Sequence, residues 1–162
     1  MLTPATVCLA VPLYEQLELL KKNKVAVVCG ILSGTLASLT GIFVLCMLFG
    51  FNHKQYVTML PKSITTAIGI GISEELGGIV TITVAVIIIT GILGNVIADT
   101  VFHIFKIKNP LAKGLALGTA SHAIGTARAI EMGPVEGAMS SLAVAVAGLL
   151  TVIFVSGFAQ LI

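Results

Sequence analysis

The sequence predicts an all-α integral membrane protein that crosses the bilayer more than once. Hydrophobic residues make up 57% of its 162 residues and charged residues only 10%, whereas ordinary globular domains carry roughly 25% charged residues. Three uncharged runs, residues 25–51, 76–98 and 137–162, each exceed the roughly 20 residues that a helix needs to cross the hydrocarbon core. We therefore expect a polytopic protein with three long transmembrane helices over about these ranges.

Shorter uncharged stretches alternate with these runs, at residues 1–14, 63–73 and 114–127. They are rich in Gly, Ala, Ser, Thr and Pro and have at most 14 residues, which is too short to cross a bilayer comfortably. Irregular backbone is tolerated at bilayer depth only where protein or a water-filled cavity covers it. We therefore expect re-entrant or broken-helix segments that line a cavity, with a full crossing of the membrane as the alternative.

The basic residues discriminate between these two arrangements, because cytoplasmic loops collect Lys and Arg. If all six segments cross, four of the nine basic residues lie on one side of the membrane and five on the other, which does not indicate an orientation. If the short segments re-enter, seven share one side and two lie on the other; letting only the last segment cross still leaves six to three. The re-entrant arrangement obeys the rule, and it would give consecutive repeats opposite orientations, as in many secondary transporters.

Weak internal similarity supports such repeats. The tripeptide AIG occurs at 67–69 and again at 123–125, and SGTLAS at 33–38 aligns with TGILGN at 90–95. Repeats at a fixed period indicate that a fold is built from similar units. The pattern predicts inverted repeats within a single membrane domain that spans 1–162, with repeat ranges of 1–51, 60–105 and 114–162.

Composition and motifs also limit the function. A net charge of +2, without a basic patch interleaved with aromatic residues, excludes nucleic acid as a partner. Cys8, Cys29 and Cys46 lie in apolar segments without CxxC spacing, so they indicate buried hydrophobic side chains and no metal site. The phosphate-binding motif GxxxxGK[ST] and the zinc motif HExxH are absent. We therefore expect binding and passage of a ligand, without catalysis or a cofactor.

The last short segment continues into the most conspicuous polar group of the chain. Arg128 is the only arginine, and it follows fourteen uncharged residues. Its guanidinium presents a planar fork that suits a carboxylate, so one hypothesis is an anion-binding residue. The alternative is a side chain that extends from a helix end to the lipid headgroups.

Candidates for coupling to an ion or a proton lie nearby. His122 has a side chain of ordinary pKa near ~6.5 and could load and release a proton across a membrane; the alternative is a neutral imidazole that hydrogen-bonds between helices. Glu131 shares a helix face with Arg128, three residues earlier. Glu131 and Glu74 could bind Na⁺ or a proton, or they could be solvated loop acids.

Hydroxyl groups and glycines complete the predicted binding site. If the short segments are half-helices, their N-termini would offer unpaired N–H groups to an anion; small residues also let membrane helices pack closely. The predicted substrate-binding residues are Arg128, His122, Ser121, Thr119, Gly125, Thr126, Ser63, Thr65, Thr66 and Thr6.

Three stretches of the sequence resemble one family. LTPATVCLAVPLYEQ at 2–16, LPKSITTAIGIGISEELGG at 60–78 and LALGTASHAIGTARAIEMGPVEGAMSSLAVAVAGLLT at 115–151 are similar to the best-marked stretches of the LrgB/CidB family of antiholin-like and holin-like membrane proteins. The similarity extends from end to end of the chain. Because family members are typically longer, we expect this chain to correspond to their C-terminal two-thirds and to be N-terminally truncated relative to the family.

The resemblance implies two alternative functions. The family includes plastid envelope proteins that exchange glycolate and glycerate, and bacterial members linked to pyruvate movement together with a small LrgA/CidA-type membrane protein. This implies a carrier of a small carboxylate anion in the bacterial cytoplasmic (inner) membrane. The alternative is a homo-oligomeric holin-like or antiholin-like regulator of murein hydrolase activity, cell lysis and programmed cell death, with no substrate site. No catalytic residues are implied.

Overall fold

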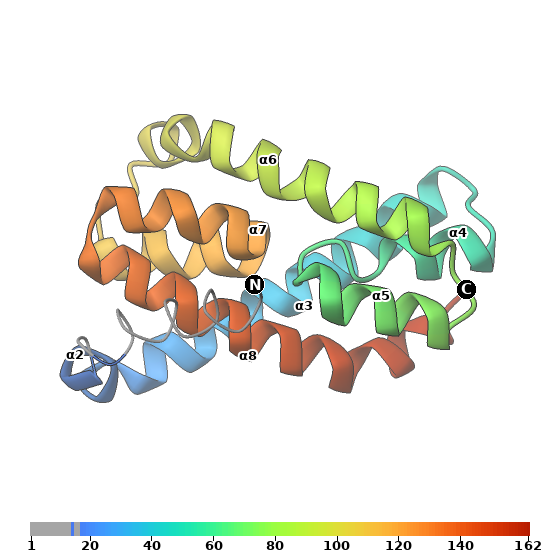
Figure 1. Ribbon diagram of the computed structural model, residues 1–162, viewed down its shortest axis with the longest axis horizontal. Helices are drawn as coiled ribbons and strands as arrows, with labels where there is room; N and C mark the ends of the chain where they lie inside the picture. Colours follow the sequence, from blue (N-terminus) through green and yellow to red (C-terminus); the bar gives the residue numbers. More distant parts are fainter. Residues whose placement is uncertain (1–13, 15–16) are drawn as a thin grey trace.

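The computed structural model describes residue 14 and residues 17–162, and this part of the chain forms helices joined by loops, without a strand (Figure 1). Three helices are long and apolar enough to cross a membrane: α3 (Lys24–Leu48), α6 (Val80–Ile104) and α8 (Pro134–Ala159). The all-α fold class and the three predicted long helices are confirmed. The predicted short segment at 1–14 falls outside the described residues except for Tyr14.

The ends of the long helices differ from the predicted ranges for local reasons. α3 ends at Leu48, before residue 51, because Gly50 adopts a left-handed φ of 64° that a continuing helix does not allow. α6 begins at Val80, after residue 76, because Gly77 has a φ of 74° and interrupts the helix there. α8 begins with Pro134, since proline suits the first helical turn, where its missing N–H is not needed.

Residues 53–75 fold back on themselves and form what we call the first hairpin. Two short helices, α4 (His53–Met59) and α5 (Thr66–Glu75), are joined by a loop over residues 60–65. The hydroxyl of Thr83 in α6 lies 2.9 Å from the carbonyl oxygen of Thr58 and 2.8 Å from Oγ of Ser73. One residue of α6 therefore contacts both arms, and α5 returns to the end of the bundle from which α4 entered (Figure 1).

Residues 110–132 form the second hairpin, within α7 (Pro110–Met132). The helix is broken at His122, whose φ of 43° and ψ of −137° are not helical. In a straight helix, Leu117 and Gly125 would lie about 12 Å apart along the axis. Instead, a Cβ atom on Gly125 would lie 2.8 Å from the carbonyl oxygen of Leu117. The chain therefore reverses at His122 into two antiparallel arms.

The two hairpins enter the bundle from opposite ends (Figure 1). The first hairpin starts and finishes at the end where α3 finishes and α6 begins, which we call the α4 end. The second starts and finishes at the other end, which we call the α2 end after α2 (Leu17–Lys22). Their tips approach each other near the middle of the long helices, because Ser63 and Thr119 border the same gap of about 10 Å³ together with Ser38 of α3. The backbone thus follows the re-entrant path, while the repeat ranges stay a prediction.

The basic residues follow this arrangement closely. Those at the α2 end are Lys21, Lys22, Lys24, Lys106, Lys108, Lys113 and Arg128. Lys54 lies at the α4 end, in α4, whereas Lys62 lies in the loop at the tip of the first hairpin. Because cytoplasmic segments are the ones enriched in Lys and Arg, we predict that the α2 end is the cytoplasmic end.

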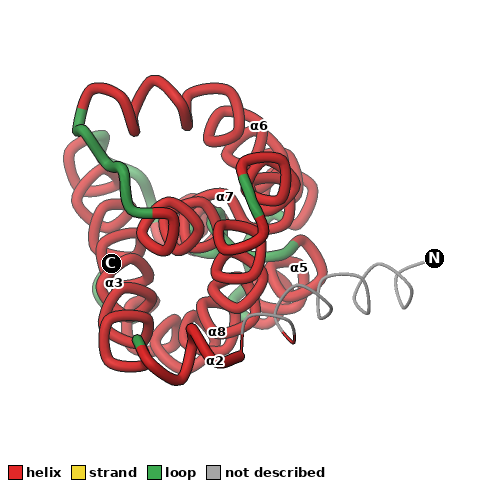
Figure 2. The backbone as a smooth tube through the Cα atoms, turned by 90° about the vertical axis from the view of Figure 1, so that its left-hand side faces the viewer, coloured by secondary structure: helices red, strands yellow, loops and turns green. Residues whose placement is uncertain are grey.

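The apolar core is divided between the two halves of the bundle. Viewed along its long axis, the molecule has α7 between α3, α6 and α8, and α7 packs against all three (Figure 2). A cluster that includes Leu39, Tyr56, Leu60 and Val155 fills the half toward the α4 end. Large apolar side chains remain exposed along the long helices, such as Val96 at 72%. Exposure of this kind suits helices that face lipid.

Candidate functional site

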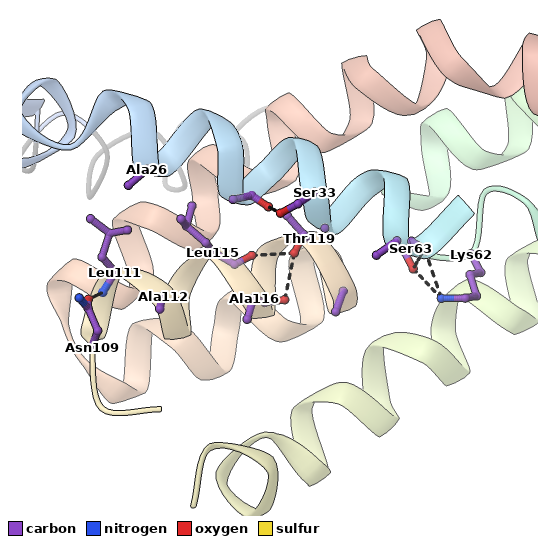
Figure 3. A pocket seen from close by; sticks show the side chains of 15 residues that line it. Ala26, Ser33, Lys62, Ser63, Asn109, Leu111, Ala112, Leu115, Ala116 and Thr119 are labelled. Carbon is purple, nitrogen blue, oxygen red and sulfur yellow. Dashed lines mark hydrogen bonds between the residues drawn. The ribbon is translucent and has the colours of Figure 1, made fainter. Parts of the chain in front are cut away.

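A groove of about 780 Å³ lies between α3 and the first arm of the second hairpin (Figure 3). It extends from Asn109, at the α2 end, to Lys62 and Ser63 at the tip of the first hairpin. Small side chains make room for it, because the α3 wall consists of Ala, Gly and Ser and the α7 wall contains three alanines. The lining residues are Ala26, Gly30, Ser33, Gly34, Ala37, Ser38, Lys62, Ser63, Asn109, Leu111, Ala112, Leu115, Ala116, Thr119 and Ala120.

Lys62 carries the charge at the inner end of this groove. Its Nζ donates a hydrogen bond to Oγ of Ser63 at 2.8 Å and lies 3.5 Å from Oγ of Ser38. In the described part of the chain, both ion pairs are made by Arg128, so Lys62 has hydroxyl partners and no carboxylate partner. Removing an ammonium group from water is costly unless an opposite charge compensates for it. The inner end of the groove is therefore suited to an anion.

Two hydroxyl groups contact Lys62, those of Ser38 in α3 and of Ser63, and a third, that of Thr119 in α7, lines the same groove. Ser38 Oγ donates to Ser63 Oγ at 3.0 Å, which links α3 to the tip of the first hairpin. Thr119 donates to the carbonyl oxygen of Leu115 at 2.8 Å and lies against Gly34 of α3, where a Cβ atom would be only 2.9 Å from its Oγ1. These hydroxyls keep acceptor capacity toward the ammonium and toward a ligand.

His122 lies at the tip of the second hairpin but points away from the groove. The side chain is buried, and its Nε2 is 2.9 Å from the carbonyl oxygen of Ile87 in α6. Gly91 makes this approach possible, since a Cβ atom there would lie 2.8 Å from Cε1 of the imidazole. This position matches the alternative of a histidine that bonds between helices, and its role in proton coupling stays a prediction.

Ser121, Gly125 and Thr126 lie at contacts between the second hairpin and its surroundings. Ser121 is packed against Gly94 of α6, and Gly125 against the opposite arm of the hairpin. The Thr126 hydroxyl lies 3.0 Å from the carbonyl oxygen of His122 and 2.8 Å from Oγ of Ser140 in α8. None of the three borders the groove. They hold the hairpin together, and a direct binding role for them stays a prediction.

Arg128 lies at the α2 end, apart from the groove. Its guanidinium forms ion pairs with Asp99 of α6 and with Glu131, the latter at 2.7 Å. Hydrogen bonds to these two carboxylates raise the pKa of Arg128 above its ordinary value. Both carboxylates are largely exposed. The anion-binding capacity of this arginine is therefore occupied by the protein's own acids.

The remaining predicted residues are spread over the first hairpin. Thr65 is the last residue of the loop that holds Lys62 and the N-cap residue of α5, and Thr66 is the first helical residue; both are half-buried. Glu74 is exposed near the C-terminal end of α5. Thr6 lies outside the described residues. Of the predicted binding residues, the groove thus brings together Ser63 and Thr119 only.

Lys62 and Ser38 were not among the predicted binding residues. A signal for Lys62 is present in the sequence, because it is the only charged residue between Lys54 and Glu74. Its position between two apolar stretches does not by itself distinguish a loop lysine at the membrane surface from one inside the bundle. Ser38 belongs to a long apolar run, and only its hydrogen bond to Ser63 reveals that it faces the first hairpin.

The chain is similar to membrane proteins of one family. It matches the LrgB-like family over residues 1–161. The antiholin-like protein LrgB of Bacillus subtilis (strain 168) is 41% identical over 161 residues, which cover 99% of this chain and 70% of that protein. Proteins of the same name from Bacillus cereus (strain B4264) and Bacillus anthracis (strain CDC 684 / NRRL 3495) are 41% identical over 157 residues, or 97% of this chain and 68% of theirs. No solved structure matches. With three helices able to span a membrane, the chain is a multi-pass membrane protein that belongs to the LrgB-like family.

Proposed function

We propose that this protein carries a small monocarboxylate, of the pyruvate, glycolate or glycerate type, across the bacterial cytoplasmic membrane. The observation that supports this most is the position of Lys62. Its ammonium lies where two opposed hairpins approach each other, bonded to hydroxyls but to no carboxylate of the described chain. Ionisable groups at such depth in membrane proteins usually mark the path of a substrate or an ion.

The shape of the groove supports a pathway that is open on one side. It reaches the α2 end at Asn109, where seven basic residues would attract anions from the cytoplasm. Beyond Lys62, toward the α4 end, the apolar cluster around Leu39, Tyr56 and Leu60 closes the bundle. A site near the middle with one open and one closed side is what alternating access requires of a carrier in one of its states.

The charge of the site favours one carboxylate. A single ammonium balances a monocarboxylate, whereas a dicarboxylate would bring a second, uncompensated charge into a poorly solvated site. The Ser38, Ser63 and Thr119 hydroxyls can bond to the carboxylate and to a 2-oxo or 2-hydroxy oxygen beside it. A hydroxyl both donates and accepts, so these residues suit either kind of acid.

Uptake of labelled pyruvate and glycolate into proteoliposomes tests this proposal. We expect Lys62→Gln to lower uptake by about a hundredfold, because the buried carboxylate loses its counter-charge. Lys62→Arg should retain a substantial part of the uptake. Lys54→Gln is the matched control, since it removes an exposed lysine from the same hairpin, and it should leave uptake unchanged. Wild-type uptake by a correctly folded Lys62→Gln variant would contradict the proposal.

A second candidate function rests on the relatives. The curated proteins that this chain matches are named antiholin-like proteins, a name that favours regulation of murein hydrolase activity and lysis over transport. In that role the chain would act with further copies of itself, or with a small membrane partner, and would need no anion. Murein hydrolase activity in cells that express wild type or Lys62→Gln separates the two functions. If Lys62→Gln abolishes uptake but still regulates murein hydrolase activity, the regulation depends on contacts outside the groove.

A further inference from the structure

A second cavity, of about 550 Å³, lies at the α2 end, between the last turns of α6 and the first turn of α7. It shares no lining residue with the groove. The chain passes from α6 to α7 at this end of the bundle (Figure 1). Its lining residues are Asp99, Phe102, His103, Lys106, Ile107, Lys108 and Lys113.

The charge of this cavity is strongly positive. Three lysines border it, and Nζ of Lys113 lies 5.8 Å from the centre of the Phe102 ring, within range of a cation–π interaction. Asp99 is its one acidic lining residue, and that carboxylate is paired with Arg128. Because Arg128 already compensates the charge of Asp99, this carboxylate does not neutralise the three lysines.

The backbone holds one of these lysines at an unfavourable position. The N–H groups of Lys106 and Ile107 donate to the carbonyl oxygens of His103 and Phe102, at 3.2 and 2.9 Å, which closes the C-terminus of α6 with a Schellman motif. Lys106 occupies the left-handed position of this motif, with a φ of 53°. Glycine is favoured at that position because it has no Cβ atom. Lysine therefore carries a conformational cost at this position, which a contact of its side chain with a ligand would offset.

The surroundings of the cavity identify the ligand. Ile104 and Phe105, next to the cavity in sequence, are 65% and 71% exposed at the end of a membrane-spanning helix, so they lie where the acyl chains of a lipid begin. Clusters of Lys and Arg at the cytoplasmic end of a membrane helix attract anionic lipid headgroups. We propose that this cavity binds the phosphate headgroup of an anionic phospholipid of the cytoplasmic leaflet.

Titration of the protein in neutral detergent with phosphatidylglycerol or phosphatidylcholine, followed by native mass spectrometry, tests this proposal. We expect the variant K106Q/K108Q/K113Q to bind phosphatidylglycerol at least about tenfold more weakly, with phosphatidylcholine unaffected. The variant K21Q/K22Q/K24Q removes the same number of charges from the same end, outside the cavity, and should bind like wild type. Equal losses in the two variants would overturn the site in favour of a general surface charge.

Two further arms keep the test decisive. Glycerol phosphate should compete only weakly with phosphatidylglycerol, because it lacks acyl chains; full competition would overturn a lipid site in favour of a site for free anions. Lys106→Gly covers the case of a triple variant that fails to fold. It should raise the thermal midpoint of the lipid-free protein, because glycine suits the left-handed position, and should weaken phosphatidylglycerol binding about fivefold. Unchanged lipid affinity in Lys106→Gly would contradict the role of this lysine.

Discussion

The two hairpins differ in how their polar side chains are satisfied. In the second hairpin, Thr126 bonds to Ser140 and His122 bonds to the carbonyl oxygen of Ile87, so these groups complete their bonds inside the protein. In the first hairpin, the Lys62 ammonium bonds to hydroxyls, pairs with no carboxylate of the described residues and borders the groove. A completed bond stabilises the fold, whereas a cation without a counter-charge costs free energy until an anion binds. Lys62 of the first hairpin is thus a better candidate for binding an anion than His122 of the second.

The tips of the hairpins show the same division. The first hairpin turns through a loop of six residues, 60–65, while the second turns at the single residue His122. The loop lets one charged side chain, Lys62, border the groove while Leu60 and Ile64 stay buried, whereas a one-residue reversal brings two helical arms into direct contact. The second hairpin consequently needs glycine where its arms meet their neighbours. In the first hairpin, a Cβ atom on Gly71 would meet no neighbouring atom within 4 Å, and one on Gly69 would lie 2.5 Å from Cδ1 of Ile87, the flexible end of that side chain.

Among the substitutions that test this difference in packing, Gly118→Ala in the second hairpin should change the free energy of unfolding most. A Cβ atom there would lie 2.5 Å from the carbonyl oxygen of Ser140 and 2.7 Å from Cβ of Ala143, so α8 would have to move. We expect the free energy of unfolding to fall by about 1–3 kcal/mol, the usual cost of overpacking. Denaturant titration in detergent micelles measures it.

Gly71→Ala in the first hairpin is the matched control. Its Cβ atom would enter open space within α5, where alanine has the higher helix propensity, so the free energy of unfolding should rise by up to about 1 kcal/mol. Equal destabilisation by the two substitutions would mean that the hairpins pack alike and would remove the distinction between them.

A smaller effect is expected from the hydroxyl pair between the second hairpin and α8. Thr126→Val leaves the Ser140 hydroxyl buried without its partner, which should lower the free energy of unfolding by about 1 kcal/mol. The double variant Thr126→Val/Ser140→Ala should lose less than the sum of the single variants, because each removes the same bond. Strict additivity would indicate that the two hydroxyls do not interact.

Much of the architecture can be predicted from the sequence, because the bilayer sets the length of a spanning helix. The uncharged runs locate α3, α6 and α8 to within six residues; glycine or proline accounts for three of the ends, whereas α6 continues past Asp99, which ends the uncharged run but not the helix. The seven-to-two distribution of basic residues favours hairpins over crossings, because Lys and Arg collect in cytoplasmic loops however the helices pack. Both are properties of segments, and they do not depend on which side chains meet.

The candidate site is less predictable, because it depends on which side chains meet. His122 and Lys62 are each isolated polar groups in apolar segments, and sequence does not show that one faces α6 while the other faces the groove. Similarly, Arg128 is conspicuous as the only arginine, but its partner Asp99 is 29 residues away and is brought close only by the fold. Tertiary partners, absent from local patterns, determine which charge is available to a ligand.

Arg128→Gln should have the smallest effect on transport. It sharpens the comparison between the hairpins, because Lys62 lies in the first hairpin and Arg128 in the second. Its ion pairs are solvent-exposed, and such pairs contribute little to stability, so we expect uptake within about twofold of wild type. Phosphatidylglycerol binding should weaken at the same time, because Asp99 would then offset the lysines of the second cavity. A loss of uptake as large as that of Lys62→Gln would instead return the anion site to the second hairpin. Since one charge is removed in each variant, the position of the charge alone decides between these outcomes.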